Sequence, residues 1–177
     1  RIKKMLMKEY DESDNLDKYI QDGISILIKF PQNKFPDSDT RDMLATFYFS
    51  RLWLVAQLRK ENKSSKMCHV IIDEIKTLPT LASFMEKYIT EFRRNRIALS
   101  IACHSLKQFG KLLDQMLACG SNFFILTPCE KNSIETLKQL VTPFTLEDCL
   151  ELKPFHSLAI INYGNQYWRG VVKLDKD

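Results

Sequence analysis

The chain has 177 residues, of which 45% are hydrophobic, and this is enough for one α/β domain with a substantial core. Its longest apolar stretch, residues 43–58, contains Arg51 and is shorter than the roughly 20 residues that span a bilayer, so we expect no membrane span. The net charge of +4 permits contact with nucleic acid without indicating it, and five cysteines with no Cys-x-x-Cys pair fit a reducing, cytoplasmic location.

The first elements are predicted from charge and hydrophobic patterning. Residues 1–20 are charged and amphipathic and begin with Arg1 rather than methionine, so we expect the sequence to be a piece of a longer polypeptide. The pattern predicts an opening helix over residues 2–19. The apolar run over residues 24–30, closed by Pro31, predicts a strand that is covered on both faces.

Two helices and a second strand follow. Residues 39–61 are predicted to be helical, with Asp39 as the N-cap, and the helix is apolar nearly all round, which predicts deep packing. Residues 67–72 form a short apolar run of strand length that ends abruptly in Asp73-Glu74. Over residues 81–92, apolar side chains at i, i+3, i+4 and i+7 predict an amphipathic helix.

The remaining sequence continues the alternation of strands and helices. Strands are predicted over 97–103 and 122–127, and helices over 106–119 and 130–141. This order predicts a single α/β domain over residues 1–177, with a mostly parallel sheet and helices on both of its faces. The tail differs, because the Gly164-Asn165 pair predicts an antiparallel hairpin extension over residues 157–174.

The acidic pair Asp73-Glu74 is the first candidate site. Ligands of parallel sheets bind at the carboxyl ends of the strands, and the sequence Val70-Ile71-Ile72-Asp73-Glu74 has the form of a Walker B element. In such an element the aspartate orders the water shell of a magnesium ion and the glutamate polarises the attacking water. The alternative is that Asp73 caps a turn and Glu74 is merely solvated.

A second polar strand end follows the predicted strand 97–103. His104 at this position suits a sensor that hydrogen-bonds a γ-phosphate or the attacking water, although it equally suits a histidine that bonds a loop carbonyl. Ser105 is expected to join Asp73 in cofactor binding. The neighbouring Cys103 is not expected to act as a thiol nucleophile, because adjacent strand residues point to opposite faces.

Arginines close the amphipathic helix. The helix dipole favours positive charge at this position, so it can account for Arg93, Arg94 and Arg96 without any functional role. The sharper hypothesis is that Arg93 or Arg94 stabilises the transferred phosphoryl group in a neighbouring subunit. No segment matches the phosphate-binding loop G-x-x-x-x-G-K-[ST], and the three histidines are too scattered along the sequence to suggest a zinc site.

Several segments together resemble the FtsK/HerA superfamily of hexameric P-loop ATPases, particularly its conjugative coupling and type IV secretion branches. The resemblance covers residues 22–127. The matching segments are DGISILI at 22–28, TRDML at 40–44, SRLW at 50–53, IIDE at 71–74, EFRRN at 91–95 and LSIACHS at 99–105. The family usually has glutamine at the position of His104, and its Walker A loop would lie upstream of Arg1.

The resemblance implies a RecA-like core in a homo-hexameric ring that uses ATP and Mg²⁺ to drive DNA translocation or conjugative transfer. It implies that Asp73 and Glu74 are the Walker B pair, with Asp73 on the metal through water, that Arg93 or Arg94 acts in trans, and that His104 is the sensor. ATPase activity would then belong to the longer protein, and this piece alone would be inactive. DNA and other transfer or secretion components would be partners, in the cytoplasm or at the cytoplasmic face of the membrane. The alternatives are a type IV secretion ATPase and a non-catalytic α/β interaction module.

Overall fold

The computed structural model describes residues 16–58, 66–164 and 166–175. The chain divides into two compact units, the first from residues 1–71 and 91–100 and the second from residues 72–90 and 101–177. The architecture is mixed α/β: a parallel pair of strands with helices, and a separate antiparallel sheet of three strands. Within the described residues, no helix has the length and apolarity that crossing a membrane requires.

The first unit begins with the helices α2 (Leu16–Asp22) and α3 (Ser38–Leu58). Most of the predicted opening helix, and the predicted end of the second helix, lie outside the described residues. The prediction of Asp39 as the N-cap was wrong. The carboxylate of Asp37 accepts the backbone N–H of Thr40 at 2.7 Å, so the cap lies two residues earlier than predicted, and α3 begins at Ser38.

Helix α3 is buried along one side only. Leu44, Phe49, Trp53 and Ala56 are buried, whereas Leu54 and Leu58 on other parts of its surface are exposed. The deep packing predicted from its composition is therefore wrong for the residues described. The rings of Phe49 and Trp53 both pack on Phe92, with centroids 5.7 Å and 5.3 Å from the ring of Phe92.

The apolar run over residues 24–30 forms no strand. Its residues are extended, but they join neither sheet of the described chain, and Leu27 is 78% exposed. The prediction of a strand covered on both faces was wrong. Apolarity shows only that a segment prefers burial, whereas a strand also requires a neighbouring edge that supplies hydrogen-bond partners.

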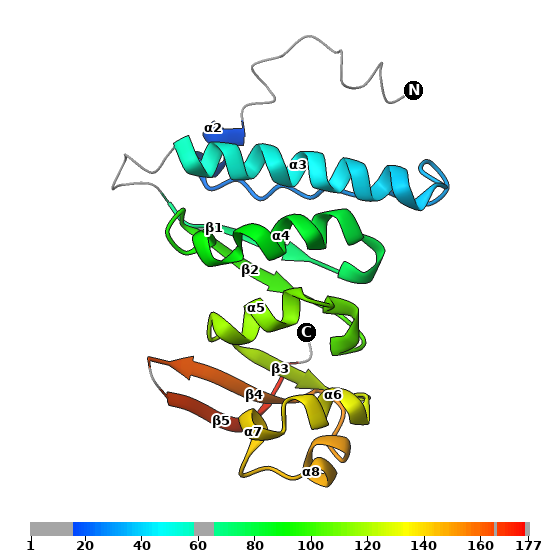
Figure 1. The fold of residues 1–177 in the computed structure, drawn as a ribbon, viewed down its shortest axis with the longest axis vertical. Helices are drawn as coiled ribbons and strands as arrows, with labels where there is room; N and C mark the ends of the chain where they lie inside the picture. The colour runs from blue at the N-terminus through cyan, green and yellow to red at the C-terminus, as the bar shows by residue number, and fades with distance from the viewer. Residues whose placement is uncertain (1–15, 59–65, 165, 176–177) are drawn as a thin grey trace. The chain divides into compact units, whose positions relative to one another are not determined.

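The strands β1 (Cys68–Ile72) and β2 (Ile97–Ile101) form the parallel pair, as Figure 1 shows. In the first unit, the N–H of Cys68 donates to the carbonyl of Arg96 at 2.9 Å. In the second unit, the N–H of Ala102 donates to the carbonyl of Ile72 at 2.9 Å. Both predicted strands are thus confirmed, although the second ends two residues early.

The chain between these strands contains the short 3-10 turn η3 (Ile75–Thr77) and the helix α4 (Pro79–Phe92). The predicted amphipathic face is confirmed, because Leu81, Met85 and Phe92 are buried. A hydrophobic face at helical spacing is the most reliable signal in the sequence, and here it agrees with the structure.

The helices of the second unit are shorter than predicted. The predicted helix 106–119 is divided into η4 (Leu106–Phe109) and α5 (Leu112–Ala118) at Gly110, whose φ is +53°. The predicted helix 130–141 is divided into α6 (Lys131–Thr136) and α7 (Lys138–Val141). The sequence analysis did not predict α8 (Leu146–Leu150), which Thr145 caps through a capping box with Asp148.

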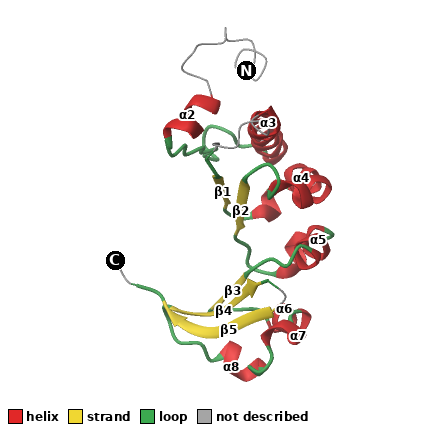
Figure 2. Cartoon of the chain, turned by 90° about the vertical axis from the view of Figure 1, so that its left-hand side faces the viewer, coloured by secondary structure: helices red, strands yellow, loops and turns green. Residues whose placement is uncertain are grey.

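The antiparallel sheet has the order β3–β4–β5, with β3 (Phe123–Leu126) paired to β4 (His156–Tyr163) and β4 paired to β5 (Gln166–Lys173). The C-terminal hairpin is confirmed. The predicted strand 122–127 exists, but its placement in the parallel sheet was wrong, because the hairpin returns to pair with it. Helices α6 and α7 lie on one side of this sheet (Figure 2), where Arg169 Nε donates to the carbonyl of Leu140.

Candidate functional site

The acidic pair lies in a sharp turn at the end of β1. Glu74 has a left-handed backbone with φ 58° and ψ 59°, which is uncommon for a residue with a Cβ. The carbonyl of Glu74 accepts the hydroxyl of Thr77 at 3.0 Å and the N–H of Thr77 at 3.1 Å. In this turn Ile75 is buried in the core with no exposed surface, whereas the side chains of Asp73 and Glu74 are exposed to solvent.

Glu74 and His104 are brought together across the parallel pair. The Glu74 Oε1 atom lies 3.8 Å from the His104 Nε2 atom, and the two side chains are 53% and 83% exposed. The hydrogen bond between Ala102 and Ile72 joins the ends of the two strands in the same unit. An exposed pair of this kind stabilises a fold by only about 0–1 kcal/mol.

The loop that carries His104 is tied to the segment that follows β3. The Ser105 hydroxyl donates to Glu130 Oε2, and the Ser133 hydroxyl donates to the same oxygen at 3.3 Å. The Ser133 hydroxyl oxygen also accepts the N–H of Leu106 at 3.0 Å. The hydrogen bond from Ser105 is the main reason why the pKa of Glu130 lies below its ordinary value, and the charge of Lys107 acts in the same direction.

Ser105 is therefore engaged with protein groups. Its hydroxyl group donates to Glu130, and the oxygen of the same group accepts the N–H of Lys107 at 3.4 Å and caps η4. A nucleotide that used this hydroxyl would have to compete with Glu130 for it. Cys103, two residues earlier, is half-buried, and burial raises the pKa of its thiol.

The arginines lie in the first unit, in the turn that leads from α4 to β2. Arg93 and Arg94 are exposed. The turn is anchored by Asn95, which is buried and donates from Nδ2 to the carbonyl of Glu91 at 2.9 Å. Asp73, Glu74, His104 and Ser105 all belong to the second unit.

The donor set suits a magnesium ion that keeps most of its water. Within the described part of the chain, no group of three or more His, Cys, Asp and Glu side chains is arranged to hold a metal ion. A closed zinc or calcium site is therefore not seen there. Magnesium often binds proteins through only one or two carboxylates, with water and substrate phosphates as its other ligands, and the solvent-facing Asp73 fits that mode.

The sequence analysis missed Glu130 and Ser133. The signal that identified Asp73 and His104, a polar residue soon after an apolar strand, also applies to Glu130, which follows β3 after Pro128 and Cys129. The predicted helix over residues 130–141 accounts for Glu130 only as its first residue.

Comparison of the chain with protein-family models, with curated proteins and with solved structures gave no match.

Proposed function

We propose that this chain is the C-terminal part of the RecA-like core of a hexameric P-loop ATPase similar to the FtsK/HerA superfamily, and that the whole protein couples ATP hydrolysis to DNA translocation or conjugative transfer. One observation carries the proposal. Glu74, directly after Asp73, has its carboxylate 3.8 Å from the imidazole of His104, which follows the adjacent parallel strand. Strand ends of parallel sheets are where such enzymes assemble their sites.

Each residue then has a defined role. Asp73 would hold a magnesium ion through water, and that ion would supply the positive charge that neutralises the phosphates. Glu74 accepts a proton from the attacking water, and its left-handed backbone directs the carboxylate outward. His104 donates a hydrogen bond at the reaction centre, and Ser105 assists in cofactor binding.

Arg93 or Arg94 completes the site in trans. Both side chains are exposed at the end of α4, as an arginine that reaches a neighbouring subunit must be. The proposal is that the parallel pair β1–β2 belongs to a mostly parallel sheet with helices on both of its faces, which the longer protein completes together with a phosphate-binding loop, while β3, β4 and β5 form a separate antiparallel sheet. It also includes a homo-hexameric ring in the cytoplasm or at the cytoplasmic face of the membrane, with DNA and transfer or secretion components as partners. Energising type IV secretion is the related alternative.

The test is ATP hydrolysis by the full-length protein carrying Glu74→Gln. Glutamine keeps the shape of the side chain but cannot accept the proton, so turnover should fall about 10²–10⁴-fold while magnesium-ATP still binds. Glu151→Gln, an exposed glutamate after α8, is the matched control and should hydrolyse ATP normally. Unchanged turnover in Glu74→Gln would remove the water-activating role.

A non-catalytic interaction module is the second candidate, and one observation favours it. The Ser105 hydroxyl is already bound to Glu130, so this part of the strand end is occupied by protein contacts. The two candidates differ in nucleotide binding. If the full-length protein fails to bind magnesium-ATP in calorimetry, the ATPase proposal is wrong and the interaction module is favoured.

A further inference from the structure

The ion pair with Glu74 is too weak to fix the orientation of the His104 side chain by itself. Its imidazole is 83% exposed and lies 3.8 Å from Glu74, and exposed charge pairs hold long side chains only weakly. The nearest backbone restraint is the hydrogen bond from the N–H of His104 to Gln108 Oε1 at 3.2 Å, which lies within the same loop. The hydrogen bond from the N–H of Ala102 to the carbonyl of Ile72 fixes the start of this loop beside β1, and a restraint after His104 would fix its other end.

Glu130 supplies such a restraint. Its Oε2 atom accepts the Ser105 hydroxyl, so the residue next to His104 is bound directly to the segment after β3. The same oxygen accepts Ser133 Oγ at 3.3 Å, and Ser133 Oγ in turn accepts the N–H of Leu106 at 3.0 Å. The Glu130 carboxylate and the Ser133 hydroxyl that it orients thereby hold two consecutive loop residues, Ser105 and Leu106.

Charge strengthens this arrangement. Hydrogen bonds to an ionised carboxylate are shorter and stronger than bonds between neutral groups. Glu130 is ionised at neutral pH, since the Ser105 hydroxyl and the charge of Lys107 both lower its pKa. The carboxylate therefore remains a strong acceptor throughout the physiological pH range.

We infer that Glu130 is a positioning residue, which holds the loop of His104 so that the imidazole stays opposite the Glu74 carboxylate. The effect on hydrolysis rests on the proposed function, whereas the positioning itself is a property of this chain. Misplacing a reacting group by about 1 Å can cost as much as a hundredfold in rate, so removal of Glu130 should act on kcat rather than on the KM for ATP.

The first measurement is independent of catalysis. In NMR spectra of the 177-residue chain, Glu130→Ala should abolish the nuclear Overhauser contact between the His104 ring and the Glu74 side chain, and should speed exchange of the Leu106 amide about tenfold. Glu135→Ala, an exposed residue on the helix α6 that follows Glu130, is the matched control and should change neither signal. An intact contact and unchanged exchange in Glu130→Ala would overturn the positioning role.

The second measurement is a double-mutant cycle in the full-length ATPase. Glu130→Ala should lower kcat roughly tenfold to a hundredfold with an unchanged KM, and Glu130→Gln should restore most of the rate because its amide oxygen still accepts the Ser105 hydroxyl. In a His104→Ala background, Glu130→Ala should have no further effect. An equal loss in both backgrounds, or no loss in either, would refute the inference.

The two measurements separate the possible failures. If Glu74→Gln leaves hydrolysis unchanged, the water-activating role of Glu74 is wrong, and the NMR contact alone decides whether Glu130 orients His104. If Glu74→Gln abolishes hydrolysis and Glu130→Ala does not slow it, the proposed function stands and the inference about Glu130 is wrong.

Discussion

Removal of the ring of Phe92 should destabilise the first unit strongly. Phe92 is 3% exposed and stands between Phe49 and Trp53, with ring centroids 5.7 Å and 5.3 Å away. Burial and cavity effects make a buried Phe→Ala change cost about 3–5 kcal/mol. Each aromatic pair contributes about 0.5–1.5 kcal/mol beyond burial, so Phe92→Leu, which keeps most of the apolar volume, should cost about 1–3 kcal/mol.

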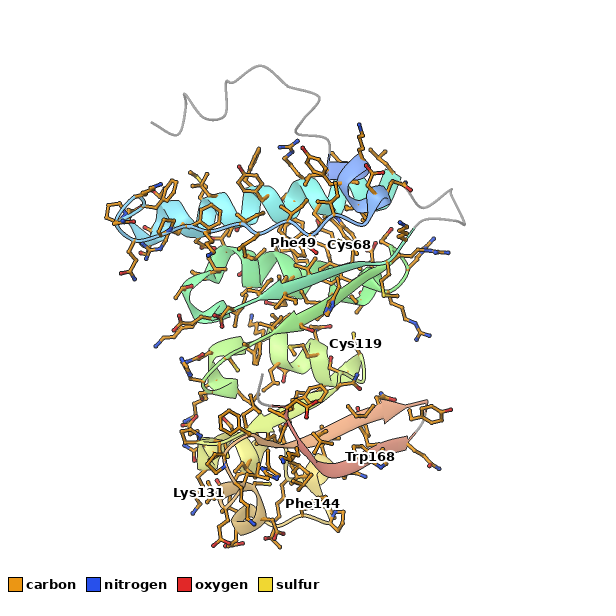
Figure 3. All side chains as sticks on the ribbon, turned by 180° about the vertical axis from the view of Figure 1, so that it is seen from behind. Phe49, Cys68, Cys119, Lys131, Phe144 and Trp168 are labelled. Carbon is orange, nitrogen blue, oxygen red and sulfur yellow. The ribbon has the colours of Figure 1, made fainter. Side chains whose placement is uncertain are left out.

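Urea unfolding measured by tryptophan fluorescence tests these values. The chain has two tryptophans, and Trp168, on the last strand and half exposed, can be replaced by phenylalanine so that Trp53 alone reports on the first unit (Figure 3). Tyr163→Ala is the control, because its side chain is 84% exposed and its loss should change the free energy of unfolding by less than about 0.5 kcal/mol. A cost below about 1 kcal/mol for Phe92→Ala would refute this account of the core.

Two further predictions concern titratable groups. The Ser105 hydroxyl is the main cause of the lowered pKa of Glu130, so Ser105→Ala should raise the pKa of Glu130 toward its ordinary value. Carbon NMR of the Glu130 carboxyl group measures this shift. An unchanged titration of Glu130 would exclude the hydrogen bond. A lowered carboxyl pKa stabilises the fold at neutral pH, and this stabilisation should be lost as the pH falls through the pKa of the folded state. The free energy of unfolding that is lost over this pH range should be smaller in Ser105→Ala than in the unchanged chain. Burial raises the pKa of Cys149 to about 11, so only about a thousandth of this thiol is ionised at pH 8. Alkylation should therefore modify the exposed Cys119 first and Cys149 only on unfolding, and mass spectrometry detects the modified residues. Early alkylation of Cys149 would show that its surroundings are open to solvent.

Part of the candidate site could be predicted from sequence. The acidic pair after β1 and His104 after β2 were found because a parallel sheet places successive strand ends at one edge, and Glu74 and His104 are in fact neighbours. Glu130 could not be joined to Ser105 in the same way. The contact spans 25 positions in the sequence, and it depends on the loop geometry at both ends.

The local pattern of the chain determined the helix α4, the strands β1 and β2, and the C-terminal hairpin, because side-chain periodicity and a Gly-Asn turn act over a few residues. Tertiary structure alone decided which strand pairs with β3, since the backbone groups of an apolar strand are satisfied equally well by a parallel or an antiparallel neighbour. It also decided that residues 24–30 are extended without joining a sheet of the described chain. Hydrophobic runs show which segments favour burial, but the available edges and hydrogen-bond partners determine where they lie.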